Sequence, residues 1–288
     1  MTITVIGATG RVGSGVVRKL VNAGLTVRAL VRDPDKARRL FGDSPGLEIV
    51  QVHLDDLAVA ATGLAGSDAV FLAMGSVGAE ANAQRIVIQA AAATPGLRQL
   101  VRLSVLNAGP DSLGINQRAH WSLDVTAQVA GVPYSTIRPA IFSASVLAGA
   151  AEIKASRTWT GLADTGRVAL SDHRDTADAA VAVLTEPSTW GQHHDLTGPR
   201  QVSWPEALQV LSAELGETVT FRTTSAIRLI QRLTQAGVPA GQAELLVTRE
   251  WAIMAGENEL TTETVRELTG HEPRAIEEFF RENRELFS

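Results

Sequence analysis

The segment GATGRVG, residues 7–13, constrains the fold of this chain more than any other part of the sequence. It follows a short apolar run, ITVI, and precedes a run with helical periodicity, so we expect a strand, a tight turn and a helix. In such a unit Gly7 makes the turn, Gly10 lets backbone N–H groups approach a pyrophosphate, and Gly13 lets the helix lie close to the strand. The segment therefore predicts a dinucleotide site; the alternative is that its small residues only ease a β-to-α turn.

The first part of the chain, up to about residue 140, repeats this alternation of strand and helix. The predicted strands are ITVIG, TVRALVR, LEIVQVHL, DAVFLAM, QLVRLSV and PYSTIRPA, and helical runs separate them. Strands that alternate with amphipathic helices form parallel sheets that are covered on both faces. The sequence thus predicts an α/β protein with a doubly wound, Rossmann-type parallel sheet.

Further along the chain the alternation becomes irregular, and helical runs dominate the last third. We expect residues 1–150 to form the dinucleotide-binding domain. Residues 172–198 should join it through a helix capped by Asp175 and the strand HHDLTG. Residues 151–171 and 199–288 would form a smaller, mainly helical lobe on the substrate side. A set of aromatic residues is expected to pack this lobe: Trp159, Trp204, Trp251, Phe279 and Phe280.

The composition is that of a globular chain, with 45% hydrophobic and 20% charged residues in 288 and a formal net charge of −5. The charges are interspersed, so nothing indicates binding to nucleic acid or to an anionic membrane. There are no cysteines, and the adjacent His193 and His194 point to opposite faces of a strand, so we expect no metal site. Neither a signal peptide nor a run of about 18 apolar residues occurs. We expect a cytoplasmic protein, monomeric or homodimeric.

The end of the second predicted strand, ALVRDPDKA, addresses which dinucleotide is bound. NAD-binding domains carry an acidic residue there for the ribose hydroxyls, but Val31 occupies that position. Arg32 follows it, Lys36 lies one helical turn further, and Arg11 can reach the same place from the glycine-rich turn. Cations grip a 2′-phosphate, which favours NADP(H) over NAD(H). Asp33 either accepts from the ribose or caps the following helix.

Several segments together resemble one family. GATGRVGSGVV, ALVRDPDKA, FLAMGS, LSVLNAG and HWSLDVTAQVAGVPYSTIRPAIF occur in an order similar to that of the NmrA-like group of atypical short-chain dehydrogenases/reductases. The resemblance covers residues 1–200 and extends to the C-terminal lobe only in general character. It implies the extended short-chain dehydrogenase fold. It also implies either NADPH-dependent reduction of quinones or other conjugated substrates, or nucleotide sensing without catalysis.

The resemblance also implies which residues hold the cofactor. The pyrophosphate would lie against the first turn, at Gly7, Thr9, Gly10, Arg11, Val12 and Gly13. Arg32 and Lys36 would bind the 2′-phosphate, and Leu54 would flank the adenine. The remaining contacts, along the ribose and the nicotinamide, would come from Ala73, Met74, Gly75, Pro139 and Phe142. One departure concerns the adenine end, where His53 stands in place of the Asp that extended members often have before that Leu.

The catalytic pair of the wider superfamily is missing. Short-chain dehydrogenases use Tyr-x-x-x-Lys, in which the lysine lowers the pKa of the tyrosine. The one tyrosine of this chain, Tyr134, has Arg138 four residues later and lies in an expected core strand. On the helix that contains QRAHWSLD, Asn116 takes the tyrosine position and His120 the lysine position, with Asp124 one turn beyond. Either Asp124 orients His120 as a proton donor, or the two form an exposed pair without a role.

Three functions stay open on these residues. Hydride transfer from NADPH to a quinone-like or other conjugated acceptor needs no phenol, because water, Ser104 or His120 can supply the proton. Ser104 ends the fifth predicted strand, where such sheets meet ligands, and is equally an ordinary turn residue. The second function is non-catalytic NADP(H) sensing with a protein partner, and the third is reduction of an imine or enone in the same pocket. We expect a reductase of a small-molecule substrate, with sensing as the alternative.

Overall fold

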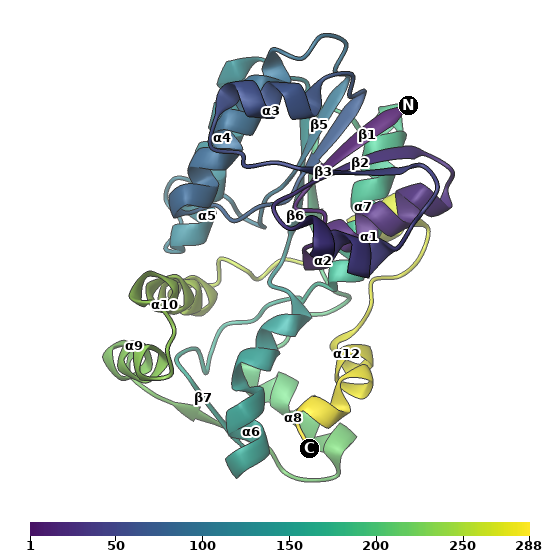
Figure 1. Cartoon of the computed structure of the whole chain (residues 1–288). Coiled ribbons are helices and arrows are strands. Elements are labelled where there is room, and N and C mark those ends of the chain that lie inside the picture. Colours follow the sequence, from purple (N-terminus) through teal and green to yellow (C-terminus); the bar gives the residue numbers. More distant parts are fainter.

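In the computed structural model, which describes residues 1–288, seven parallel strands form the central sheet in the order β3-β2-β1-β4-β5-β6-β8 (Figure 1). Their bounds are β1 (Thr2–Ile6), β2 (Thr26–Val31), β3 (Leu47–Gln51), β4 (Ala69–Leu72), β5 (Gln99–Leu103), β6 (Tyr134–Pro139) and β8 (His193–Leu196). The strand order reverses between β1 and β4. In doubly wound sheets a ligand crevice opens at this point, beyond the carboxyl ends of the strands.

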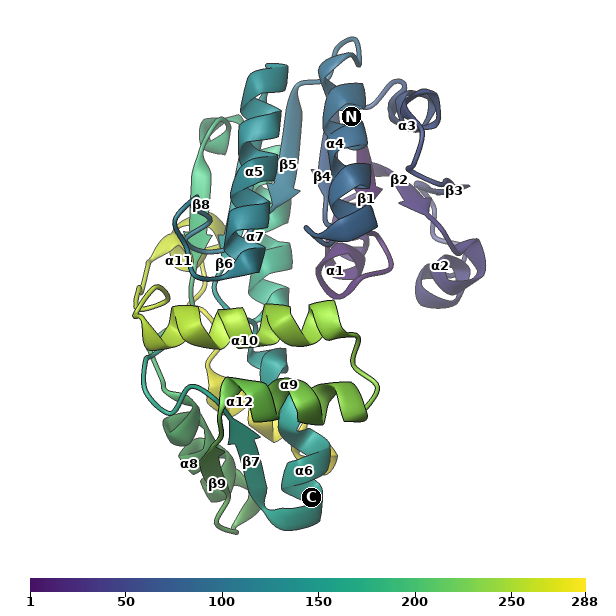
Figure 2. The ribbon, with the colours of Figure 1, turned by 90° about the vertical axis from the view of Figure 1, so that its left-hand side faces the viewer.

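Helices cover both faces of this sheet. One face carries α1 (Arg11–Asn22) and α7 (His173–Thr185). The other face carries α3 (Leu57–Leu64), α4 (Gly78–Ala92) and α5 (Ile115–Ala130). Two further short helices are α2 (Pro34–Phe41), which follows β2, and η2 (Pro187–Thr189), which precedes β8. Figure 2 shows α4 and α5 in front of the sheet and α1 behind it. Every residue of β4 is buried, which explains why its sequence, AVFL, is apolar throughout. The predicted doubly wound α/β fold is confirmed.

A second, smaller lobe lies beyond the carboxyl ends of the strands (Figure 1). Its elements are η1 (Ser143–Gly149), α6 (Ala150–Ser156), β7 (Thr158–Gly161), α8 (Trp204–Leu215), β9 (Thr220–Thr223), α9 (Ala226–Gln235), α10 (Ala240–Met254), α12 (Ile276–Glu282) and η3 (Arg284–Leu286). In its core Trp159 packs against Trp204, with ring centroids 5.2 Å apart. By contrast, α11 (Thr264–Thr269) packs against α7. No helix of the structure has both the length and the apolar character needed to cross a membrane.

Two local expectations about these elements are wrong. The helix expected to begin at Asp175 begins at His173, because the side chain of Asp172 accepts a hydrogen bond from the Arg174 N–H at 2.7 Å and caps the helix. Trp251 is 44% exposed on α10, whereas the other four aromatic residues expected in the lobe are buried. In the structure α7 packs on the sheet and β8 pairs with β6. The division of the chain into domains stays a prediction.

Two glycines of residues 7–13 let β1, α1 and β4 approach one another closely. Gly7 has a φ angle of +81°, and a Cβ atom on it would lie 1.9 Å from the carbonyl oxygen of Ala73. A Cβ atom on Gly13 would lie 2.2 Å from the carbonyl oxygen of Gly7. Any side chain at either position would push these elements apart, because backbone atoms cannot move aside as a flexible side chain can. The start of α1 is therefore held directly above the carboxyl end of β1.

Candidate functional site

Two adjoining cavities open at the carboxyl ends of the central strands. The first has a volume of about 510 Å³ and the second of about 410 Å³. Met74, Gly75 and Leu103 contribute to the walls of both, so the cavities meet beyond β4 and β5. This is the crevice that a sheet of this strand order places beside its point of reversal.

One end of the first cavity lies against the start of α1, where its wall contains Gly7, Ala8, Thr9 and Gly10. No side chain caps α1, and the backbone N–H groups of Arg11 and Val12 have no acceptor within the protein. The N–H of Gly10 is already used, because it donates to the carbonyl oxygen of Gly7 at 2.9 Å. The side chain of Val12 is buried in the core, and Gly13 lies against β1. Free N–H groups at a positive helix end form an anion site.

Two cations line the same cavity at the end of β2. The strand ends at Val31, so Arg32 follows it directly, and Lys36 lies on α2. Both are exposed, and neither is in a salt bridge, since the one ion pair of α2 joins Arg38 to Asp35. An unpaired guanidinium and an unpaired ammonium at this place match the predicted 2′-phosphate contact.

Asp33 and Arg11, the other polar residues considered for the ribose end, lie outside the cavity wall. The Asp33 carboxylate accepts from the Lys36 N–H at 2.9 Å and caps α2, which is the helix-cap alternative. Arg11 is exposed and lies near α7: burial lowers the pKa of His173, and the charge of Arg11 lowers it further. A side-chain role of Arg11 at the nucleotide therefore has no support from its position.

Most of the residues implied along the nucleotide line the two cavities. The first cavity contains Leu54, Ala73, Met74 and Gly75, and the second contains Met74, Gly75, Pro139 and Phe142. His53 also lines the first cavity, together with Asp55 and with Glu80 from α4. No recognisable motif marks Asp55 or Glu80 in the sequence, so neither was expected at the site. The contacts of all these residues with a nucleotide stay predictions.

The lobe supplies one wall of the second cavity. Leu245, Leu246 and Arg249 contribute from α10, which Figure 2 shows crossing beneath the sheet domain, and Asn258 contributes from the loop that follows. Arg249 is the one charged residue in the wall, and its guanidinium donates to Glu250 at 2.8 Å. Asn258 is 2% exposed, and its Nδ2 atom has no hydrogen-bond partner. This wall offers hydrogen-bond donors and contains no carboxylate.

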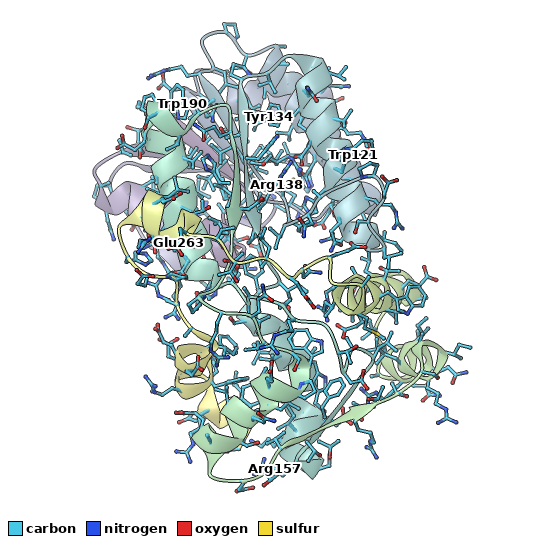
Figure 3. The ribbon with its side chains drawn as sticks, turned by 180° about the vertical axis from the view of Figure 1, so that it is seen from behind. Trp121, Tyr134, Arg138, Arg157, Trp190 and Glu263 are labelled. Carbon is cyan, nitrogen blue, oxygen red and sulfur yellow. The ribbon has the colours of Figure 1, made fainter.

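A buried arginine lies next to the second cavity. Arg102, in β5, has no exposed surface. Its guanidinium donates to a carboxylate oxygen of Asp124, to the Ser104 hydroxyl at 3.1 Å, to the Gln84 amide oxygen at 3.3 Å, and to His120 at both Nδ1 (3.1 Å) and the carbonyl oxygen (2.9 Å). Asp124 also accepts from Arg138 at 3.3 Å. Figure 3 shows Arg138 on the side of the sheet that faces α5, the helix of Trp121. The signal for this cluster in the sequence is the arginine inside the apolar run QLVRLSV, although the run by itself predicts only a buried strand.

The contacts of this cluster bear on the three candidate catalytic residues, which are His120, Ser104 and Asn116. The expected contact between Asp124 and His120 is wrong, because both contact Arg102 instead. The Ser104 hydroxyl donates to Asp124 at 3.2 Å, so its proton is already engaged. Asn116 accepts from the hydroxyl of a serine that follows β4 at 2.6 Å, and its amide lies in the wall of the second cavity. All three residues line or border this cavity, and their catalytic roles stay predictions.

His120 is held in its neutral form. It is 6% exposed, so the alternative of an exposed pair with Asp124 is wrong. Burial and the positive charge of Arg102 lower the pKa of His120 well below its usual value. His120 therefore carries no net charge near neutral pH and is a poor source of a proton.

This low pKa predicts a loss of stability in acid. An unfolded chain binds a proton at His120 below about pH 6.5, and the folded protein does not, so the free energy of unfolding falls as the pH is lowered through this range. One such group contributes at most about 1.4 kcal/mol per pH unit. Urea unfolding at several pH values between 7.5 and 5.5 should show a shallower decline for His120→Gln than for the unsubstituted protein. Equal slopes for the two proteins would contradict a low pKa at His120.

The chain was compared with known proteins. It is 32% identical over 287 residues to (4-alkanoyl-5-oxo-2,5-dihydrofuran-3-yl)methyl phosphate reductase of Streptomyces griseus, which covers 99% of each chain. It is 31% identical over 286 residues to an NAD(P)H azoreductase of Xenophilus azovorans, over 96% of each chain. Among solved structures it is similar to the NADPH-dependent quinone oxidoreductase of Escherichia coli complexed with NADPH. That match has a TM-score of 0.90 and 27% identity, and it covers 99% of this chain and 100% of the other.

A family model also matches this chain. The model of the NmrA-like family matches residues 1–280, which include the glycine-rich turn, both cavities and most of the lobe. The match thus extends through the C-terminal lobe, beyond the residues on which the resemblance was first seen. The chain belongs to the NmrA-like family.

Proposed function

We propose that this protein is an NADPH-dependent reductase that passes a hydride to a conjugated small-molecule acceptor such as a quinone. The observation that carries this proposal is the junction of the two cavities at Met74, Gly75 and Leu103. One cavity has the features of a dinucleotide site, and the other has room for an acceptor beside it. The phosphate reductase, the azoreductase and the quinone oxidoreductase to which the chain is similar support redox chemistry of this kind.

The residues of the first cavity fit NADPH. The uncapped start of α1 offers backbone N–H groups to a pyrophosphate, and the missing Cβ atom of Gly7 keeps the turn close to β4. Arg32 and Lys36 supply two unpaired cations for a 2′-phosphate. When bound there, NADPH would supply the hydride.

The second cavity suits an acceptor that tolerates negative charge. Tyr134 is absent from its wall and packs against the core on β6, where burial raises the pKa of its phenol. No phenol therefore delivers a proton to the acceptor. A quinone or conjugated carbonyl delocalises the negative charge that hydride transfer brings over several atoms. Its oxygen can therefore be protonated by water in a later step. His120, Asn116 and Ser104 all line this cavity, which makes each a candidate contact of the acceptor.

Turnover tests this proposal directly. Purified protein should oxidise NADPH when benzoquinone or naphthoquinone is added, which is followed as the loss of NADPH absorbance. An unconjugated ketone should be a poor acceptor, and mixtures without protein serve as the control. Stoichiometric binding of NADPH without oxidation across the panel would contradict a reductase. That result would favour the alternative, an NADP(H) sensor that binds a protein partner.

A further inference from the structure

We infer that Arg102 is a positioning residue: it fixes His120 as a neutral donor whose Nε2–H faces the substrate cavity. This N–H and the side-chain amide of Asn258 together bind the acceptor oxygen that becomes negative during reduction. The substrate class is therefore a quinone or conjugated carbonyl, held by hydrogen bonds and protonated by water. The inference about the acceptor rests on the proposed function, whereas the state of His120 can be tested without it.

The tautomer of His120 follows from the chemistry of its neighbour. A guanidinium has five N–H donors, no acceptor, and stays protonated in proteins. The Nη1 atom of Arg102 lies 3.1 Å from Nδ1 of His120, so Nδ1 has to accept and cannot carry a hydrogen. A neutral imidazole with a bare Nδ1 carries its hydrogen on Nε2. No protein group accepts from Nε2, and His120 lines the second cavity.

Among the charges around His120, that of Arg102 favours the neutral ring. Arg102 reaches it from β5, and Arg138 reaches Asp124 from β6. Arg249 lies on α10 across the same cavity, where it is paired with Glu250. The nearest carboxylate, that of Asp124 on the same helix, is bound to the two arginines and to Ser104. No carboxylate contacts the imidazole, so nothing offsets the repulsion between Arg102 and a second positive charge on His120.

Asn258 supplies the second donor. Asn258 is 2% exposed and belongs to the cavity wall, and its buried Nδ2 atom has no hydrogen-bond partner in the protein. Buried amide groups are nearly always hydrogen-bonded, so an unpaired one at a cavity wall indicates a ligand. Two neutral donors and no carboxylate describe a site for an oxygen that gains negative charge.

The electron and proton balance is complete with NADPH and water. The hydride brings two electrons to the conjugated system, and one bond of that system breaks so that its electron pair moves to the oxygen. The Nε2–H of His120 and the amide of Asn258 hydrogen-bond this oxygen without giving up their hydrogens. The oxygen then takes its proton from water. A neutral imidazole does not supply that proton, because the imidazolate left behind would be a much stronger base than the oxygen that received the proton.

Nuclear magnetic resonance of the histidine ring nitrogens tests the inferred tautomer of His120 on the protein alone. The signals of His120 are assigned by their loss in His120→Gln. We expect a neutral ring with hydrogen on Nε2 that does not titrate between about pH 5.5 and 8. A ring with hydrogen on Nδ1, or one that titrates near the usual value, would overturn the role of Arg102. No substrate or cofactor is needed, so this result stands even if no acceptor is reduced.

Steady-state kinetics with a quinone test whether His120 and Asn258 bind the acceptor oxygen. His120→Leu should lower kcat about 100-fold with little change in KM, as expected for the loss of one donor to a developing oxyanion. His120→Gln, whose amide places an N–H near the position of Nε2, should keep most of the rate. Asn258→Asp, which replaces the donor with a negative charge, should lose at least about 10-fold in kcat. His193→Gln, an exposed histidine away from both cavities, is the matched control.

Two kinetic results would overturn the donor assignment. The first is a kcat in His120→Leu equal to that of the unsubstituted protein. The second is a kcat that depends on pH with an apparent pKa near 6.5 in the unsubstituted protein and loses this pH dependence in His120→Gln. His120 would then act as a proton donor. If instead no acceptor is reduced by any of these proteins, the proposed function fails while the tautomer measured by resonance remains.

Discussion

Arg32→Ala is expected to weaken NADPH binding about 10- to 100-fold and to leave NADH binding unchanged. The guanidinium lines the first cavity and has no ion-pair partner in the protein, so its full charge is available to a 2′-phosphate. Hydrogen bonds to charged groups contribute about 1.5–3 kcal/mol each, which corresponds to this range. Titration of the protein with each cofactor, followed by fluorescence or calorimetry, gives the two dissociation constants. Lys36→Ala should show the same selectivity with a smaller loss.

Arg39→Ala is the matched control for this measurement. Arg39 lies on the same helix, α2, and is exposed, but it does not line the cavity. Its removal changes the net charge by the same amount, so any general electrostatic effect on a charged cofactor appears in both variants. Equal losses in Arg32→Ala and Arg39→Ala, or equal affinity of the unsubstituted protein for NADPH and NADH, would contradict the phosphate assignment.

Arg102→Leu should lower the free energy of unfolding by about 3–5 kcal/mol. The substitution leaves the Asp124 carboxylate, which is 4% exposed, with Arg138 at 3.3 Å and the Ser104 hydroxyl as its partners. It also removes the donor of the His120 carbonyl oxygen. A buried charge that loses its partner keeps the cost of leaving water without the compensating attraction. Urea unfolding of the variant and of the unsubstituted protein measures the difference.

The double variant Arg102→Met/Asp124→Leu separates the ion pair from general loss of packing. Apolar residues of similar size remove both charges together, so we expect its stability to return to within about 2 kcal/mol of the unsubstituted protein. Its reductase rate should stay low, because Nδ1 of His120 then has no donor to fix the tautomer. Arg102→Met and Asp124→Leu are measured singly for comparison. A double variant as unstable as the sum of these two would show that the two side chains do not act as a pair.

The cofactor end of the site could be predicted because its residues are close together in the sequence. The turn of residues 7–13 and the pair Arg32 and Lys36 each follow the end of one strand. The carboxyl ends of parallel neighbouring strands meet at the same edge of a sheet, so a local pattern is enough to bring these groups together. Of the other polar residues considered there, Asp33 caps its own helix, which is one of the two alternatives for it, and Arg11 lies near α7.

The substrate end could not be predicted in this way. Arg249 and Asn258 lie in the lobe more than a hundred residues beyond β5, and no motif marks them. His120 was singled out by its position on a helix, but its contact with Arg102 was not foreseen. The sequence places Asp124 one turn away on the same helix, whereas the folded protein places Arg102 between the two side chains.

The sequence by itself determined the doubly wound sheet, the dinucleotide turn and the cations at the end of β2, because strand and helix periodicity and glycine geometry act within a few residues. Only the tertiary structure decided what lies opposite the nucleotide. There α10 and its following loop close a cavity against β5 and α5, and the charge of His120 depends on a strand residue 18 positions earlier. Burial and the charge of a neighbour set a pKa, and both depend on packing between distant segments.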